Sequence, residues 1–116
     1  MILLLVLLSL PCVSHGTNWH CGTKEYPISI SFSQRLFALG CLDSVKRALN
    51  NCCFLHDKCY CSKTESRESC DKSFCRCIRR STLKESVFCQ IILTESSCLL
   101  VRKFGQASFE NCVDVL

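Results

Sequence analysis

Apolar residues recur with helical spacing over most of the chain, and the breaks between the periodic segments predict several short helices. Residues 17–31 lack this spacing and predict an irregular N-terminal loop. Helices are then expected at residues 33–39, 43–49, 50–61, 71–83 and 84–93. Beyond residue 93 the pattern predicts no definite element, although Leu99, Leu100 and Phe104 are expected to be buried. The expected fold class is therefore all-α.

Two of these helices carry cysteines with matching spacing. Cys52 and Cys59 are seven residues apart in one helix, and Cys70 and Cys77 are seven apart in the next, so each pair shares one helix face. Residues 62–69 contain no apolar side chain and form an exposed connection that places the helices antiparallel. In that arrangement the bridges Cys52–Cys77 and Cys59–Cys70 can close together, whereas the crossed pairing requires parallel helices. The pattern favours a disulfide-clamped helical hairpin.

The other helical patterns predict the core. In the helix at 71–83, the inner face consists of Cys70, Phe74, Cys77 and Ile78. In the segment at 84–93, an apolar stripe is expected to serve the core rather than a ligand site, and it consists of Val87, Phe88, Ile91 and Ile92.

The N-terminus predicts a secreted protein. The apolar run at 2–10 is shorter than the roughly 20 residues that a transmembrane helix needs, and it leads through Pro11 to small residues. Residues 1–16 are therefore expected to be a signal peptide and residues 17–116 a single domain. No later stretch is long or apolar enough to predict a transmembrane helix.

Cysteine usage agrees with an oxidising compartment. Of 13 cysteines, Cys12 lies in the expected signal peptide, and the 12 that remain predict a disulfide framework. Zinc binding is the alternative that the spacings Cys59-x-Cys61 and Cys75-x-Cys77 suggest, and secretion disfavours it. The pairing of six cysteines does not follow from the sequence, and these are Cys41, Cys61, Cys75, Cys89, Cys98 and Cys112.

The charge is unevenly distributed. The formal net charge is +4, and residues 58–84 carry eight Lys or Arg against three acidic residues, a local balance of +5. Such a patch favours anionic surfaces such as lipid headgroups or polyanions. A solvated helix face that only aids solubility explains the charge equally well. No nucleic-acid partner is expected.

His56 lies between the two expected clamps. In an antiparallel pair it is level with about residue 73, and Asp71 is about 3 Å away along the helix axis. One interpretation is a His56–Asp71 pair in which the carboxylate orients the imidazole. The other is that Asp71 only stabilises the N-terminus of its helix.

The motif Cys-Cys-x-x-His-Asp-x-Cys-Tyr at residues 52–60, followed by Cys-Asp-x-x-Phe at 70–74, resembles the secreted phospholipases A2. The bee-venom-like and nematode branches are the most similar, and the resemblance covers about residues 19–78. It implies that His56 is the general base that activates water for attack on the sn-2 ester of a glycerophospholipid. Asp71 is then the partner of His56, and Tyr60 supports the pair. The resemblance also implies the bridges Cys52–Cys77, Cys59–Cys70 and Cys21–Cys53.

The same resemblance implies a calcium cofactor. Asp57 corresponds to the carboxylate ligand, and the backbone carbonyls of His20 and Gly22 correspond to ligands from the family's calcium loop. Lys24 stands where that loop has a second glycine, and lysine lacks glycine's freedom at positive φ.

Three classes of function follow from these patterns. The first is a secreted, calcium-dependent phospholipase A2 that acts peripherally at a phospholipid membrane surface. The second is a catalytically silent protein of the same fold that binds a lipid surface or a receptor. The third, a structural or antimicrobial disulfide miniprotein, leaves the setting of His56 and Asp57 unexplained.

Overall fold

The computed structural model describes residues 19–112, so the expected signal peptide at 1–16 lies outside the described residues. The helices are α2 (Ile28–Gly40), α3 (Asp43–Ser62), α4 (Arg67–Ser81), the π-helix η1 (Phe88–Leu93), α5 (Thr94–Phe104) and α6 (Gln106–Asn111). Strands are absent from this part of the chain, where only an isolated bridge joins Thr23 and Tyr26. The expected all-α, disulfide-rich class is confirmed.

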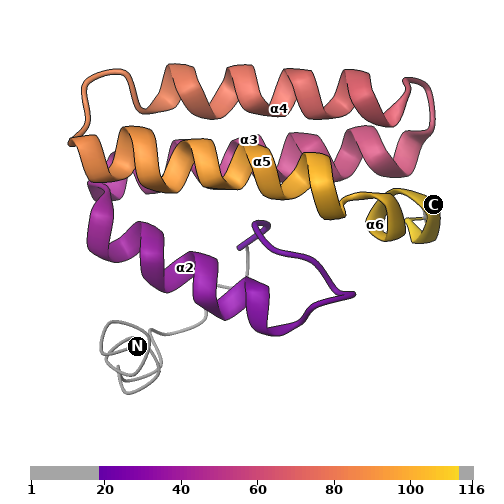
Figure 1. Ribbon diagram of the computed structural model, residues 1–116, viewed down its shortest axis with the longest axis horizontal. Coiled ribbons are helices and arrows are strands. Elements are labelled where there is room, and N and C mark those ends of the chain that lie inside the picture. The colour runs from indigo at the N-terminus through magenta and orange to yellow at the C-terminus, as the bar shows by residue number, and fades with distance from the viewer. Residues whose placement is uncertain (1–18, 113–116) are drawn as a thin grey trace.

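The three helices α3, α4 and α5 run along the long axis of the molecule (Figure 1). α4 packs against both α3 and α5. α2 lies below this group at one end, and α6 lies at the other end, close to the end of α3. No helix in the described part of the chain combines the length and apolarity needed to cross a bilayer.

Six disulfides hold these elements together. Cys52–Cys77 and Cys59–Cys70 join α3 to α4, each with a Cα–Cα distance of 5.7 Å, and Cys21–Cys53 joins the N-terminal loop to α3. These are the three pairs expected from the sequence. The structure pairs the other six cysteines as Cys41–Cys89, Cys61–Cys112 and Cys75–Cys98.

α2, α3 and α4 are longer than the sequence pattern predicted, whereas the helix expected at 84–93 is shorter and is reduced to η1 (Phe88–Leu93). α3 is continuous through 43–62 because the segment contains neither Gly nor Pro and buries Leu49, which is 1% exposed, near its middle. α4 begins at Arg67 because the Ser66 side chain accepts a hydrogen bond from the backbone N–H of Ser69. The exposed connection is therefore shorter than predicted. α2 begins at Ile28, so the irregular loop also ends earlier than expected.

Two predictions about the core were wrong. The stripe Val87, Phe88, Ile91 and Ile92 is exposed by 72%, 38%, 50% and 50%, and Leu99, Leu100 and Phe104 are exposed by 53%, 54% and 57%. The π-helical winding of η1 changes which residues face inward. Disulfides then draw Cys89 and Cys98 into the interior, beside the buried Leu93 and Thr94.

Candidate functional site

The site is built where α3 and α4 face each other. His56 Nε2 on α3 lies 2.8 Å from Asp71 Oδ1 on α4, and both residues are buried, with 8% and 4% exposure. Because an ionised carboxylate can only accept hydrogen bonds, Nε2 carries the hydrogen and Nδ1 is the nitrogen able to accept a proton. The bridges Cys52–Cys77 and Cys59–Cys70 flank the contact along α3 and fix the distance between the helices.

Asp71 holds two further polar contacts. Tyr60 donates a hydrogen bond to the same Oδ1 at 2.5 Å, and Arg67 Nε lies 3.6 Å from Oδ2. Asp71 lies in the fifth position of α4, whose N-cap is Ser66, so capping is not its role. The interpretation of Asp71 as a simple helix cap is therefore excluded.

Aromatic rings enclose the imidazole. The His56 ring centroid lies 4.1 Å from that of Tyr60 and 4.7 Å from that of Phe74. Phe109 of α6 packs edge-on against Tyr60 at 5.3 Å. Burial, together with the hydrogen bond to Asp71, raises the pKa of the Tyr60 phenol above its usual value. Tyr60 therefore remains a proton donor to Asp71 at physiological pH.

Arg67 connects the pair to the end of α5. Its guanidinium donates hydrogen bonds to the carbonyl oxygens of Val101, at 2.8 Å, and Arg102. The next turn is tightly packed, since a Cβ on Gly105 would lie 2.3 Å from Tyr60 Oη. Neither Arg67 nor Gly105 was predicted as part of the site. The spacing of Arg67 four residues before Asp71 was the available signal.

Asp57 follows His56 on α3 but turns away from Asp71, because successive helical residues are rotated by about 100°. Burial raises the pKa of the Asp57 carboxyl to about 7, and the positive charge of Lys24 opposes that rise. Although Asp57 retains solvent contact, the surrounding protein removes much of its hydration. Lys24 belongs to the N-terminal loop, which the Cys21–Cys53 bridge ties to α3 one turn before Asp57.

The loop that approaches Asp57 is anchored to α3. Besides the Cys21–Cys53 bridge, the backbone N–H of His20 donates a hydrogen bond to Asn50 Oδ1 at 2.7 Å. Gly22 has φ of 90°, and a Cβ there would lie 2.6 Å from the backbone nitrogen of Ile30. Only glycine fits this turn without strain.

The oxygen atoms available near Asp57 are of the types that bind calcium. Calcium prefers carboxylate and carbonyl oxygens, which Asp57 and a glycine-containing loop can supply. Loss of hydration raises the pKa of the Asp57 carboxyl, and a bound cation would favour its ionised, negatively charged form. The loop's own cation, Lys24, competes for that charge.

Comparison with other proteins gives one informative similarity. The chain is 34% identical over 101 residues to a protein of Caenorhabditis elegans named as phospholipase A2-like, and the match covers 87% of this chain. The match covers 55% of the relative, so the chain spans about half of that protein's length. No family model and no solved structure matches the chain. The similarity to the nematode protein therefore extends over most of this chain but over only part of that protein.

Proposed function

We propose that the chain is a secreted, calcium-dependent phospholipase A2 that hydrolyses the sn-2 ester of glycerophospholipids. The observation that carries the proposal is the buried contact of 2.8 Å between His56 Nε2 and Asp71 Oδ1. Six disulfides fit the oxidising compartment that secretion implies.

His56 is the general base in the proposed reaction. Its Nδ1 accepts a proton from a water molecule as the water oxygen attacks the ester carbonyl. Asp71 accepts a hydrogen bond from Nε2–H, which keeps the ring in the required tautomer and stabilises the imidazolium that forms. The protonated imidazole then gives the proton to the departing alcohol. Water is the attacking group, so no serine nucleophile is required.

Tyr60 and the aromatic rings hold this geometry. The Tyr60 hydrogen bond to Oδ1 limits rotation of the Asp71 carboxylate, and the rings of Tyr60 and Phe74 limit rotation of His56. Such positioning accelerates a reaction because the reacting groups start near their productive geometry.

Asp57 and the backbone carbonyls of His20 and Gly22 are the proposed calcium ligands. Bound calcium supplies positive charge for the substrate phosphate and for the oxygen that becomes negative during attack. The turn at Gly22 and the Cys21–Cys53 bridge hold the loop against α3, the helix that carries Asp57. Peripheral contact with a phospholipid surface completes the proposal, and the exposed apolar side chains of η1 and α5 suit such contact.

The proposal is tested by measuring sn-2 fatty acid release from phospholipid vesicles by the purified chain during a calcium titration. Release should appear in the millimolar range of calcium, typical of weak extracellular sites. His56→Gln should lower the rate at least about 100-fold, the smallest factor expected for loss of a general base. Disulfide mapping and near-ultraviolet circular dichroism of this variant verify that the fold is retained.

Two carboxylates provide a matched pair of variants. Asp57→Asn should abolish the calcium response, whereas Asp43→Asn, at the exposed start of α3, should leave it unchanged. Release that persists in a chelator, or in the His56→Gln protein, would refute the mechanism. Vesicle binding without hydrolysis would favour the catalytically silent alternative.

A further inference from the structure

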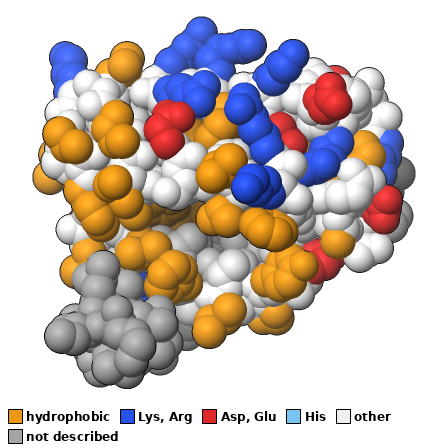
Figure 2. All heavy atoms as spheres, viewed as in Figure 1, with side chains coloured by type: hydrophobic (Ala, Val, Ile, Leu, Met, Phe, Trp, Pro, Cys, Tyr) orange, Lys and Arg blue, Asp and Glu red, His pale blue; other side chains and the backbone are white. Residues whose placement is uncertain are grey.

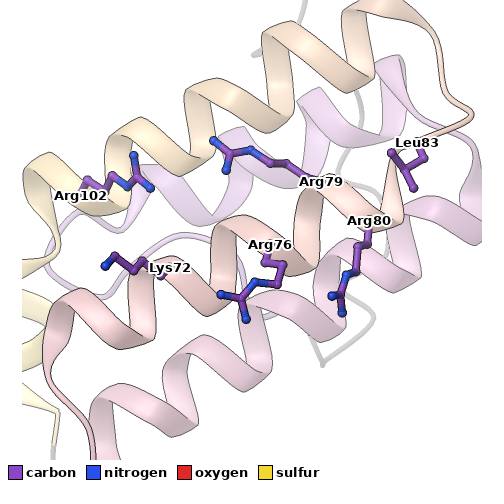
Figure 3. Close-up of a pocket in the computed structure, with 6 residues that line it drawn as sticks. All are labelled: Lys72, Arg76, Arg79, Arg80, Leu83 and Arg102. Carbon is purple, nitrogen blue, oxygen red and sulfur yellow. The ribbon is translucent and has the colours of Figure 1, made fainter.

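A groove lies between α4 and α5, outside the His56 site. Six side chains line this groove, which has a volume of about 310 Å³, and they are Lys72, Arg76, Arg79, Arg80, Leu83 and Arg102 (Figure 3). Five of the six are cationic. The same side of the molecule shows Lys and Arg side chains gathered along the upper edge, over α4 (Figure 2).

Few acidic groups offset this charge. Glu95 on α5 forms a two-pronged ion pair with Arg79, at 2.9 and 2.8 Å. Within residues 19–112, Lys72, Arg76 and Arg80 have no carboxylate within ion-pair distance. All three side chains are exposed. The groove therefore offers several unneutralised cations to a solvent-borne anion.

The framework of the groove is rigid. The Cys75–Cys98 bridge joins α4 to α5, and both cysteines are buried, with 1% and 2% exposure. Arg79 spans the two helices through its ion pair with Glu95. The cations are thus spaced by a fixed helix pair rather than by a loop, which lowers the entropic cost of binding.

The groove and the His56 site use different faces of α4. Lys72, Arg76 and Arg80 recur every four residues, and at about 100° per residue they lie roughly 100° to 180° around the helix from Asp71. Eight residues of helix separate the first from the last, a length of about 12 Å. An anion that lies along this row does not reach the contact between His56 and Asp71.

We propose that the groove binds a linear sulfated polysaccharide. A row of cations on successive turns matches the repeated charges of a polyanion chain better than it matches one isolated headgroup. Each planar guanidinium group can donate two parallel hydrogen bonds to two oxygens of one sulfate group. Leu83 is the one apolar side chain in the lining, so the groove lacks an anchor for lipid chains. This binding goes beyond the proposed hydrolysis and does not depend on it.

The test uses the full chain and a size-defined heparin oligosaccharide, with affinity measured by calorimetry at several salt concentrations. Binding should weaken steeply as salt rises because bound counterions are released from the polyanion. Arg76→Glu combined with Arg80→Glu should weaken binding at least about tenfold. The matched control combines Arg47→Glu with Lys103→Glu, which makes the same charge change at exposed positions outside the groove. The control should bind within about twofold of the unmodified chain.

Absence of heparin binding would overturn the proposal. Equal losses in both double variants would also overturn it, because they would show that overall charge, rather than the groove, governs binding. Phosphatidylglycerol vesicles serve as a third arm. If vesicles require Arg76 and Arg80 while heparin does not, the groove binds lipid headgroups instead. Repeating the titration with the His56→Gln protein separates this result from any failure of the proposed hydrolysis.

Discussion

Asp71 is the residue at which the polar contacts of the site converge. Its Oδ1 accepts hydrogen bonds from His56 and Tyr60, both on α3. Its Oδ2 forms an ion pair with Arg67, one turn earlier on α4. The carboxylate is therefore held from both oxygens, and its orientation sets that of the imidazole. Arg67 acts through Asp71 and is a positioning residue.

Replacing Arg67 tests this role. Arg67→Gln should lower kcat about tenfold with little change in KM, because it loosens Asp71 without touching the substrate. Arg67→Lys retains the charge and should recover part of the rate. Steady-state kinetics and the nitrogen shifts of the His56 ring, measured by NMR, check both statements. A loss of thermal stability with unchanged kcat and an unchanged His56 spectrum would assign Arg67 a structural role alone.

At the scale of elements, Gly105 controls how closely the junction of α5 and α6 approaches α3. Its φ of −76° is accessible to any residue, so alanine there causes no backbone strain. The cost is steric, because a Cβ would lie 2.3 Å from Tyr60 Oη and 2.5 Å from the Val101 carbonyl oxygen. We expect Gly105→Ala to lower the free energy of unfolding by about 2 kcal/mol, as measured by denaturant titration.

A double-mutant cycle identifies which contact causes that loss. Tyr60→Phe removes the hydroxyl that a Cβ at position 105 would strike first. Gly105→Ala should therefore cost at least about 0.5 kcal/mol less in the Tyr60→Phe background. Additive effects would instead assign the loss to the Val101 carbonyl and to Arg67 Nε, which lies 3.2 Å from the same Cβ position.

The contact between α4 and α5 has a pH dependence that follows from Glu95. The hydrogen bonds from Arg79 lower the pKa of Glu95 below its usual value of 4.5. A carboxylate with a lowered pKa in the folded state stabilises the fold above the unfolded-state pKa, and this contribution disappears as pH falls through the folded-state pKa.

The expected effect is small because Arg79 and Glu95 are about half exposed, with 48% and 43% side-chain exposure. We expect Glu95→Gln to lower the free energy of unfolding by about 0.5 kcal/mol above pH 5. The difference should shrink towards zero as pH falls below 4. Urea titrations at several pH values measure it, and a difference that stays constant down to the lowest pH would contradict the ion-pair explanation.

Sequence reasoning succeeded where residues obeyed a single local rule. The seven-residue spacing of Cys52 and Cys59 matched that of Cys70 and Cys77, and the structure has both bridges. It failed for Ile91 and Leu99, because burial in this region depends on which side chains the disulfides draw inward. A period-based prediction treats those two apolar residues as core, although cysteine and threonine fill the interior there.

The site was predictable to a similar extent. A shared helix face placed His56 level with Asp71, and the two side chains are in contact. Arg67 was assigned to an exposed connection because its segment contains no apolar residue. Its contact with Val101 depends on where α5 ends, and the sequence beyond residue 93 predicted no definite element. Local sequence patterns therefore did not predict contacts between segments that are distant in the chain.

At the scale of the whole molecule, the two charged regions are separated. The Asp57 carboxylate lies on α3, to which the Cys21–Cys53 bridge ties the N-terminal loop, whereas unneutralised cations line the groove between α4 and α5. The proposed binding sites for a divalent cation and for a polyanion thus lie on different parts of the protein. Binding of either one can be measured without the other.

Calcium should stabilise the folded chain because the proposed ligands come from two segments that meet only in the fold. Asp57 belongs to α3, and Gly22 belongs to the loop that the Cys21–Cys53 bridge holds beside it. A ligand present at 100 times its Kd stabilises the folded state by about 2.7 kcal/mol. For a domain of about 100 residues, each kcal/mol raises Tm by roughly 4–8 °C.

We therefore expect calorimetry to show Tm rising by several degrees over millimolar calcium and falling again when a chelator is added. Asp57→Asn should remove the rise, whereas Asp43→Asn should retain it, because Asp43 lies at the distant start of α3. Measuring Tm keeps this test independent of catalytic activity. An equal rise in both variants would place the cation elsewhere, and no rise in the unmodified chain would contradict the proposed calcium site.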